Sequence, residues 1–487
     1  MTNFAAVDLG AQSGRVAVGA LENGRLTVEE VHRFENTPVE ERGALRWDVE
    51  RLFEEATDGL RIAARDAPLA SVAVDSWAVD FGLVDSAGQL LHQPVHYRDT
   101  RRADTVESVY ARIPPRELYE RTGIQLMPIN TIFELAALAL EADQALDQAD
   151  RLLLIPDLLH HRLCGAVSSE FTNATTTQCF DPRTGDWAYD LLERLGIPTR
   201  LLPEVVPPAT PIGRTQDGAQ VIAVATHDTG SAVAAVPFRD ADSAFLSVGT
   251  WSLVGLEVDE PLITDETFAA NLTNEGGVAG TFRLLRNVTG LWLLHECRRT
   301  WESEGHSLSF AEIIALAGAA PSLCALIDPD DEALVGPGNM PARIAELCRL
   351  SGQPAPEAPG AIARCILESI ALKHALVVNR LREIRGTSTS ELHVVGGGAR
   401  NELLCRSTAE AAGLPVLAGP EEATLIGNLL VQAMALGELA SLEEAREVVR
   451  ASFVPVTYEP SFAPAWVEAR DRFAELLTTR APLEVSS

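Results

Sequence analysis

The N-terminal part of the chain combines hairpin, helix and strand patterns in an order that few folds accommodate. Two apolar runs meet at a glycine turn between residues 4 and 22, and Asn23-Gly24, a strong hairpin signal, leads into a further run. Apolar residues then recur at helical spacing over 47–67, and the short β-branched run 71–75 follows. The pattern predicts two successive β-hairpins, a helix and a strand.

The same order returns in the second half of the chain. Residues 243–258 place a glycine turn between two apolar runs, 361–384 is a long amphipathic pattern, and 392–395 is typical of a strand. We interpret the two copies as an internal duplication.

The two glycine turns also match residue by residue. Aligning Gly10 with Gly249 aligns Ser13 with Ser252. A chance match is the alternative, because short glycine turns are easily imitated.

The length of the chain favours two domains. At 487 residues it exceeds the roughly 250–300 residues beyond which one hydrophobic core stops growing. Duplicated α/β halves that each begin with a hairpin facing phosphate are typical of the actin-like (ribonuclease H-like) ATPase fold, in which the active site lies in the cleft between the halves. We therefore expect an α/β protein with domains 1–240 and 241–487.

Acidic residues outnumber basic residues by 69 to 39, which gives a formal net charge of −30. Such a surface repels nucleic-acid phosphates and anionic lipid headgroups, so we expect neither nucleic acid nor a membrane as a partner. The opening MTNFAAVDLG lacks the basic and apolar regions of a signal peptide, and no apolar stretch is long enough to span a membrane. We expect a cytoplasmic protein.

The seven cysteines are scattered without a C-x-x-C pair. Neither a zinc site nor a disulfide framework is therefore indicated. We expect reduced and mostly buried thiols, and the sequence leaves a bridge between Cys348 and Cys365 open.

The familiar phosphate-binding lysines are missing. A P-loop NTPase and a protein kinase each need a lysine at the phosphates. The single lysine of this chain, Lys373, lies in the middle of the predicted helix 361–384, so both classes are excluded. The G-x-S-x-G and H-E-x-x-H hydrolase motifs are also absent from the sequence.

The N-terminal glycine turn carries groups suited to phosphate and metal. Asp8 ends the first predicted strand, and Ser13 and Arg15 follow in a turn bracketed by Gly10 and Gly14. The turn N–H groups, the hydroxyl and the guanidinium can donate to phosphate oxygens, and the carboxylate is a hard oxygen ligand suited to Mg²⁺. An ordinary hairpin with a surface arginine is the alternative.

Asp228 directly follows the buried run 221–225 and precedes a small-residue helix start. Open α/β sheets bind ligands at the carboxyl ends of their strands. We predict that Asp228 is a general base, which accepts the proton of a hydroxyl as its oxygen attacks a γ-phosphoryl group, and that it is a second oxygen ligand for Mg²⁺. A helix N-cap is the alternative.

Two further segments have the character of ligand sites. Three glycines at 396–398 separate a strand from a helix, which lets the backbone approach adenine, ribose or α-phosphate, although a plain tight turn is the alternative. Asp75, Trp77 and Asp80 resemble the wall of a polyol site, with acceptors for hydroxyls and an apolar platform. A buried tryptophan with two loop aspartates is the alternative there.

Taken together, these segments resemble the FGGY carbohydrate kinases nearly from end to end. The matching stretches include VDLGAQSGRV, DSWAVDFGLVD, TNATTTQ, ATHDTGSAV, SVGTWSLVG, ANLTNEGG, LHVVGGGARN and AGPEEATLIGN. The glycine-rich stretches are shared across the family, whereas DSWAVDF, TNATTTQ and TNEGG are more specific and carry the choice of sugar. The resemblance implies Mg²⁺- and ATP-dependent phosphorylation of a small ketose or polyol, with the sugar and the base in 1–240 and nucleotide binding in 241–487.

The resemblance also implies roles for individual residues. Asp228 would accept the proton, and the sugar would be faced by His227, Thr229, Asn287 and the backbone of Ala78. Nucleotide would be contacted by Ala11, Gln12, Ser13, Gly14, Arg15, Thr250, His295 and Gly397. Three positions depart from the usual family residue, with Ala78 in place of glycine, His295 in place of glutamine and Gln12 in place of serine.

A rival function class is an actin-like or chaperone-like ATPase that uses nucleotide to switch partners. It would leave the segment DSWAVDF and Asp228 without a task. As partners of a sugar kinase we expect only the small-molecule substrate and ATP, in a monomer or homodimer.

Overall fold

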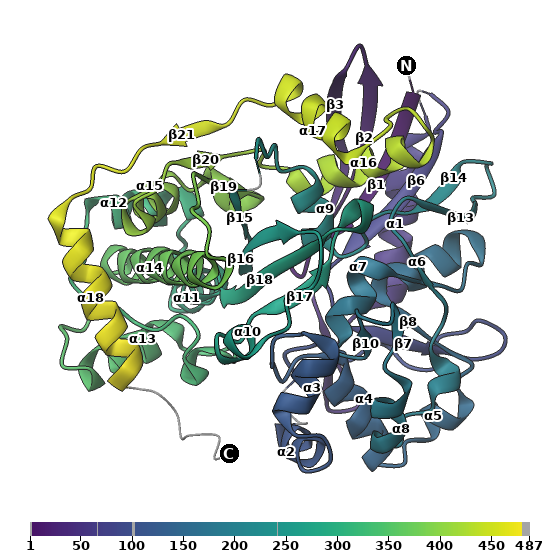
Figure 1. Ribbon diagram of the computed structural model, residues 1–487, viewed down its shortest axis with the longest axis horizontal. Helices are drawn as coiled ribbons and strands as arrows, with labels where there is room; N and C mark the ends of the chain where they lie inside the picture. The colour runs from purple at the N-terminus through teal and green to yellow at the C-terminus, as the bar shows by residue number, and fades with distance from the viewer. Residues whose placement is uncertain (1, 66, 100–102, 241, 480–487) are drawn as a thin grey trace. The chain divides into compact units, whose positions relative to one another are not determined.

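The computed structural model describes residues 2–65, 67–99, 103–240 and 242–479 (Figure 1). By their contacts the residues form two units. The first comprises Met1–Phe238, Leu256–Leu285 and Glu422–Val454, and the second comprises Arg239–Gly255, Arg286–Glu421 and Pro455–Ser487. The first unit thus includes two segments from beyond residue 240. The division at 240 stays a prediction about which part of the chain serves which substrate.

The first unit is built on a six-stranded sheet with the order β13-β14-β6-β1-β2-β3. Its strands are β1 (Thr2–Leu9), β2 (Ser13–Glu22), β3 (Arg25–Glu35), β6 (Ser71–Ser76), β13 (Thr210–Arg214) and β14 (Gln220–Ala223). Strand β1 pairs antiparallel with β2 and parallel with β6. Asn23 and Gly24 both have positive φ, 50° and 71°, as a two-residue Asn-Gly hairpin turn requires. The predicted hairpins and strand are confirmed.

Helices cover both faces of this sheet. They are α1 (Val49–Ala63), α6 (Ile155–Cys164), α9 (Asp228–Ala234) and α16 (Ala423–Ala435). Successive residues of β6 face different cores, because side chains alternate along a strand. Val74 packs with Leu52 of α1 and Leu158 of α6, whereas Ala73 packs with Val431 of α16. The predicted helix at 47–67 is therefore α1, and it packs on one face of the sheet.

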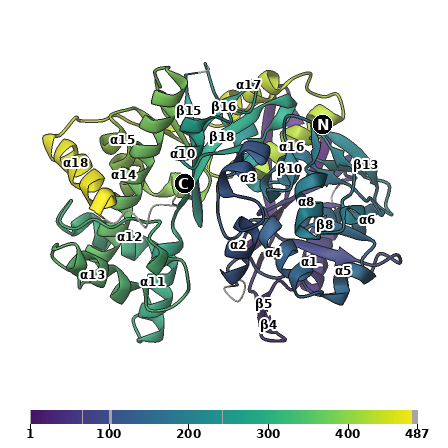
Figure 2. The ribbon, with the colours of Figure 1, turned by 60° about the horizontal axis from the view of Figure 1, so that its bottom comes forward.

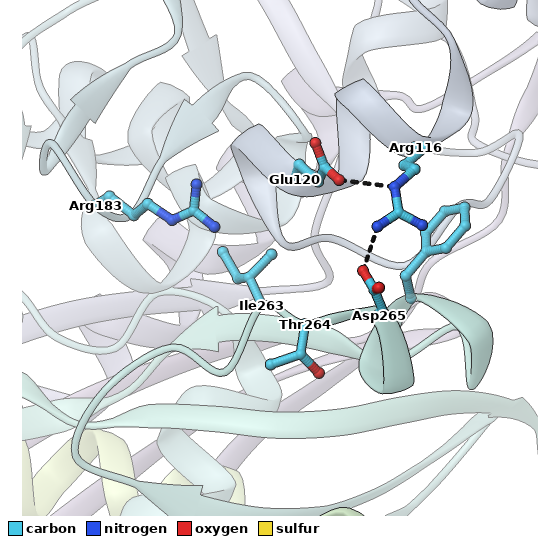
Figure 3. Close-up of a pocket in the computed structure, with 7 residues that line it drawn as sticks. Arg116, Glu120, Arg183, Ile263, Thr264 and Asp265 are labelled. Atoms are coloured by element: carbon cyan, nitrogen blue, oxygen red, sulfur yellow. Dashed lines mark hydrogen bonds and ion pairs between the residues drawn. The ribbon is translucent and has the colours of Figure 1, made fainter.

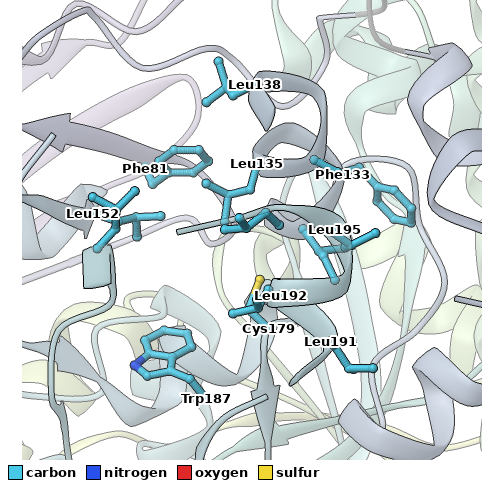
Figure 4. Close-up of a cluster of buried hydrophobic side chains, with 14 of the residues drawn as sticks. Phe81, Phe133, Leu135, Leu138, Leu152, Cys179, Trp187, Leu191, Leu192 and Leu195 are labelled. Atoms are coloured by element: carbon cyan, nitrogen blue, oxygen red, sulfur yellow. The ribbon is translucent and has the colours of Figure 1, made fainter. Parts of the chain in front are cut away.

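A mostly helical part of the first unit has its own core (Figure 4). Its elements are β7 (Phe81–Val84), α2 (Ala103–Tyr110), α3 (Pro115–Thr122), α4 (Thr131–Leu140), α5 (Gln144–Gln148), β8 (Arg151–Leu154), β10 (Phe180–Asp181), β11 (Asp186–Trp187) and α8 (Tyr189–Leu195). Phe81, Leu135, Trp187 and Leu192 lie in one buried cluster. This core holds the segment that follows β6 against α4.

A seven-stranded sheet has the order β17-β18-β16-β15-β19-β20-β21. Its strands are β15 (Ala244–Val248), β16 (Trp251–Val258), β17 (Thr273–Gly276), β18 (Phe282–Thr289), β19 (Leu392–Val395), β20 (Val416–Ala418) and β21 (Val456–Tyr458). Strand β15 pairs antiparallel with β16 and parallel with β19. Because this is the arrangement of β1, β2 and β6, the predicted second copy of hairpin, helix and strand is confirmed.

The long helix of the second copy is α14 (Pro359–Arg385), which packs on α12 (Phe310–Ala319) and α15 (Glu402–Ala412). The other helices of the second unit are α11 (Trp292–Ser303), α12 (Phe310–Ala319), α13 (Met340–Leu350), α15 (Glu402–Ala412) and α18 (Pro464–Thr479), several of which Figure 2 shows from below. Within the described ranges, no helix is long and apolar enough to cross a membrane.

The two glycine turns differ in length by one residue. Leu9 pairs with Gly14 across the first hairpin, whereas Val248 pairs with Ser252 across the second. The structural equivalent of Ser252 is therefore Gly14, and the sequence alignment of Ser13 with Ser252 is corrected. The second turn is shorter by one residue, which a comparison of spacing alone did not reveal.

Gly427 lets α16 lie directly against α9. A Cβ atom at this position would be 1.8 Å from the backbone oxygen of Ser231. Gly318 of α12 offers a matched comparison, because a Cβ atom there would meet nothing within 4 Å. The close approach of α16 thus depends on the missing side chain.

We expect Gly427→Ala to lower the free energy of unfolding by about 1–3 kcal/mol or more, because the methyl group overpacks the helix contact. The control, Gly318→Ala, should raise it by about 0.5–1 kcal/mol, because alanine favours a helix over glycine. Denaturant unfolding of both variants checks this. A Gly427→Ala protein as stable as wild type would contradict the close packing.

Candidate functional site

Three aspartates gather at one edge of the six-stranded sheet. Asp8 of β1 and Asp75 of β6 are direct partners in the parallel register. Ser76, the next residue of β6, forms a parallel bridge with His227, which precedes Asp228. Because parallel strands end at the same edge, the predicted phosphate, sugar and base segments of the first unit meet there.

Asp75 is fully buried at this edge. Asn428 of α16 donates a hydrogen bond from Nδ2 to Asp75 Oδ2 at 2.5 Å. Burial and the nearby Asp8 raise the pKa of Asp75 well above its ordinary range. The structure thus places Asn428 on a carboxyl group of the first unit.

Asp228 is the first residue of α9, and His227 is the N-cap residue. Its Oδ1 accepts hydrogen bonds from the backbone N–H of Thr229 and, at 3.1 Å, from Thr229 Oγ1. The side chain remains 30% exposed. Burial raises the pKa of Asp228, His227 lowers it and Asp8 raises it. A partly accessible carboxylate with a raised pKa is suited to proton transfer, whereas the N-cap alternative does not describe this residue.

Glu170 fixes the segment that leads to Asp228. Its Oε2 accepts hydrogen bonds from the backbone N–H and the hydroxyl of Thr226, at 2.8 and 2.9 Å. It also accepts from the Thr172 hydroxyl at 2.6 Å, and that hydroxyl accepts from the backbone N–H of His227 at 3.2 Å. Sequence reasoning missed Glu170, although it stands just before the TNATTTQ segment.

Arg15 of the first glycine turn is an ionic bridge within the first unit. Its guanidinium contacts the carboxylates of both Asp8 and Glu422. Burial lowers the pKa of Arg15, but these two carboxylates outweigh it and raise the pKa above its usual value. The arginine therefore stays charged at any working pH. Glu422 was not singled out from the sequence.

The other residues predicted in this turn are more open. Gln12 is exposed, and Ala11 and Ser13 are half-buried. Asn36 holds the turn, because its Nδ2 donates to Gly10 O at 2.8 Å and its backbone N–H donates to Gln12 O at 2.9 Å. The buried Gly14 is needed for packing, since a Cβ atom there would lie 2.2 Å from the ring of Phe34. The turn thus presents N–H groups from a fixed backbone.

Trp77 and Asp80 have partners inside the fold. Asp80 Oδ2 accepts hydrogen bonds from the indole N–H groups of Trp47 and Trp77, at 2.5 and 2.8 Å. The Trp77 side chain lies against Trp47 with ring centroids 4.2 Å apart, and Trp77 is only 6% exposed. Burial raises the pKa of Asp80 to about 8. This geometry matches the alternative of a buried tryptophan, and it corrects the expectation of an open apolar platform.

Ala78 lies in a constrained loop next to these residues. It is half-buried, and Val79 beside it has φ of 69°, a left-handed conformation that β-branched residues rarely adopt. The hydroxyl of Thr131 donates to Val79 O at 2.6 Å and helps to hold this conformation. A strained backbone held by its surroundings is frequent at functional sites.

In the second unit, the predicted residue Thr250 lies in the turn between β15 and β16. Its carbonyl accepts hydrogen bonds from the backbone N–H groups of Gly290 and Trp292, each at 3.2 Å. His295 lies one turn further along α11, with its ring 4.5 Å from that of Phe310. Burial lowers the pKa of His295 to about 4, so its imidazole is neutral near pH 7.

The triple glycine lies beside the end of β15. A Cβ atom at Gly398 would be 2.2 Å from Val248 Cγ1, whereas one at Gly397 would meet nothing within 4 Å. The predicted nucleotide residue Gly397 therefore has open space before it. Asn287, predicted to face sugar, lies half-buried on β18.

A pocket of about 260 Å³ lies in another part of the first unit (Figure 3). Arg116 lines it and forms ion pairs with Glu120 and Asp265. The remaining lining residues are Arg183, Ile263, Thr264 and Phe268. The pocket includes none of the residues predicted to bind sugar or nucleotide.

Comparison with known families identifies both halves of the chain. The N-terminal domain of the FGGY family of carbohydrate kinases matches residues 4–229, and the C-terminal domain of the same family matches residues 244–436. The chain belongs to the FGGY family of carbohydrate kinases. As an FGGY kinase it is an ATP-dependent enzyme that phosphorylates a sugar.

Several curated relatives of this FGGY kinase are rhamnulokinases. The protein from Bacteroides thetaiotaomicron is 44% identical over 97% of this chain and 98% of its own length. The protein from Pectobacterium carotovorum is 41% identical and covers 95% of each chain. A solved xylulose kinase from Lactobacillus acidophilus has a TM-score of 0.80 at 18% identity, covering 99% of both chains. The last comparison confirms the predicted two-domain α/β fold.

Proposed function

We propose that this FGGY kinase transfers the γ-phosphoryl group of ATP to the C1 hydroxyl of L-rhamnulose. The choice of sugar is supported by the similarity to rhamnulokinases over nearly the full chain. The observation that carries the chemistry is the partly exposed Asp228 at the edge of the six-stranded sheet, with His227 and Thr229 on either side. These residues form a polar corner suited to a hydroxylated substrate.

In the proposed reaction, Asp228 accepts the proton of the C1 hydroxyl as that oxygen attacks the γ-phosphorus in line. The new P–O bond forms while the bond from the γ-phosphorus to the β,γ-bridging oxygen breaks, and ADP leaves. The hydrogen bonds from Thr229 hold one carboxylate oxygen, and the exposed part of the group remains available for the substrate. His227, Asn287 and the Ala78 backbone orient the sugar.

For the nucleotide we assign the N–H groups and side chains of the first glycine turn, 11–15, to the phosphates. Arg15 contributes a permanent positive charge there, because the pKa of its guanidinium is raised by its carboxylate partners. Thr250, His295 and Gly397 serve the nucleoside side in this assignment. A neutral His295 offers one hydrogen-bond donor and one acceptor, as a glutamine amide also does.

The residues at the sheet edge fit Mg²⁺ as partial ligands. In the described ranges, no three His, Cys, Asp or Glu side chains are arranged to hold a metal ion. Mg²⁺ usually keeps several waters and binds one or two carboxylates together with substrate phosphates, so Asp8 and Asp228 suffice as protein ligands. When bound, the ion would offset the charge that develops on the transferred phosphoryl group.

Two alternatives remain for the function. Another ketose or polyol, such as L-fuculose or a xylulose, would use the same machinery. An ATPase switch would hydrolyse ATP without any sugar, but it gives no task to Asp228 and its neighbours.

A sugar panel tests the proposal. We expect coupled ADP release with Mg²⁺ and ATP to be fastest with L-rhamnulose, and slower with L-fuculose, L-xylulose, L-ribulose and glycerol. A reaction without sugar is the control. ADP release that no sugar accelerates would contradict a kinase role, and a clear preference for another sugar would contradict the assigned substrate.

Asp228→Asn tests the base. We expect turnover to fall about 10²- to 10⁴-fold, because the amide cannot accept the proton, while folding and ATP binding stay unchanged. Asp217→Asn, at an exposed aspartate in a turn, is the control and should keep full turnover. Steady-state kinetics, a melting curve and nucleotide titration of both variants check this. Undiminished turnover of Asp228→Asn would contradict the role.

A further inference from the structure

A buried ion pair lies directly behind His227. Glu275 of β17 and Arg283 of β18 are direct partners in the antiparallel register. Arg283 is 0% exposed and Glu275 is 4% exposed. Arg283 Nη2 lies 3.3 Å from Glu275 Oε2, and Arg283 Nε donates to Gly276 O at 2.8 Å. The guanidinium is therefore held in one orientation by two groups of the neighbouring strand.

The Nη2 group of this guanidinium also faces the imidazole of His227. Arg283 Nη2 lies 3.1 Å from His227 Nδ1, and Glu275 Oε2 lies 3.3 Å from the same nitrogen. The other ring nitrogen, Nε2, lies 3.4 Å from Asp228 Oδ1. His227 thus stands between the ion pair and the predicted base.

Two groups of the ion pair compete for His227 Nδ1. Glu275 Oε2, at 3.3 Å, can accept a hydrogen from this nitrogen, whereas the guanidinium, at 3.1 Å, can only donate to it. Because the contact with the guanidinium is the shorter one, we assign Nδ1 as the acceptor and place the hydrogen on Nε2. That hydrogen then points toward Asp228, where it favours the ionised carboxylate. The opposite tautomer would turn a lone pair toward Asp228 and repel the ionised form.

We infer that Arg283 and Glu275 are positioning residues, which fix the orientation and tautomer of His227 and through it aim Asp228 at the sugar hydroxyl. This inference rests on the proposed role of Asp228 as the base. Glu275 belongs to the TNEGG segment, so the interpretation also gives that segment a task. Because Arg283 is fully buried, it acts through His227 and does not itself meet solvent.

A purely structural role is the competing explanation, since a cross-strand ion pair also holds a hairpin together. The two roles separate if the pair is replaced by apolar residues of similar volume. Such replacements of buried ion pairs are often neutral or stabilising for the fold, yet they remove both polar contacts to His227 Nδ1.

The test is therefore the double variant Glu275→Leu with Arg283→Met. We expect it to melt near the wild-type temperature, to lower kcat about 10- to 100-fold because the base is misaimed, and to leave the KM for ATP within about 2-fold. Arg283→Lys keeps the positive charge but lacks the planar guanidinium with its several N–H donors, so it should retain part of the rate. Arg446→Lys, at the buried ion pair with Glu257 in the same unit, is the control and should keep kcat.

A double-mutant cycle shows whether the ion pair acts through His227. In a His227→Asn background, replacing the pair by Leu and Met should cause no further loss of kcat. If the pair had a purely structural role, the loss from the pair and the loss from His227→Asn would multiply. If the protein with the apolar pair does not fold, the cycle is carried out with Arg283→Lys instead. An unchanged kcat in the protein with the apolar pair, or losses that multiply in the cycle with either variant, would overturn the inference.

A measurement without turnover completes the test. In protein with ¹⁵N-labelled histidine, the His227 ring should show an unprotonated Nδ1 and a protonated Nε2, and Arg283→Lys should shift this pattern. A protonated Nδ1 in the wild type would overturn the inference. A wild type that phosphorylates no sugar would instead overturn the proposed function, so the two failures are distinguishable.

Discussion

The candidate site depends on the parallel pairing of β1 with β6. This register places Asp8 opposite Asp75, and the bridge from Ser76 to His227 brings Asp228 to the same edge. Burial is the main reason why the pKa values of Asp75 and Asp228 are raised, and repulsion from the nearby Asp8 carboxylate raises them further. Such an edge is expensive for a fold to maintain and is typical of a functional site.

One nearby cation and two groups from distant parts of the chain offset this concentration of negative charge. Arg15 lies beside Asp8, Asn428 donates to Asp75, and Arg283 approaches from the other side of His227. Asn428 belongs to the segment Glu422–Val454 of the first unit, which follows most of the second unit along the chain. The first unit therefore needs the late part of the chain to complete its acidic edge.

Much of the fold could be predicted from the sequence, because its signals are local. The Asn23-Gly24 turn, the apolar period of α14 and the run before Asp228 each specify an element without help from distant residues. The repeated order then indicated two similar halves. The length of the second glycine turn was missed, because a one-residue difference in a turn changes the pairing without changing the pattern of apolar residues.

The partners of the site residues could not be predicted, because they are set by long-range packing. Glu170, Glu275 and Arg283 are single charged residues in ordinary surroundings in the sequence, and only the fold shows that they are buried around Thr226 and His227. In the same way, Trp77 and Asp80 resembled the wall of a sugar site in the sequence. In the fold, Trp47 packs against Trp77, and the indole N–H groups of both tryptophans donate to the Asp80 carboxylate.

If Asp228 is the base, it must meet the reacting hydroxyl of the sugar, and a crystal structure with L-rhamnulose and a non-hydrolysable ATP analogue would show this contact. We expect the C1 oxygen within about 2.6–3.2 Å of the Asp228 carboxylate, with His227 and Thr229 beside the sugar. A sugar bound with its C1 hydroxyl away from Asp228, or in the pocket lined by Arg116 and Arg183, would contradict it.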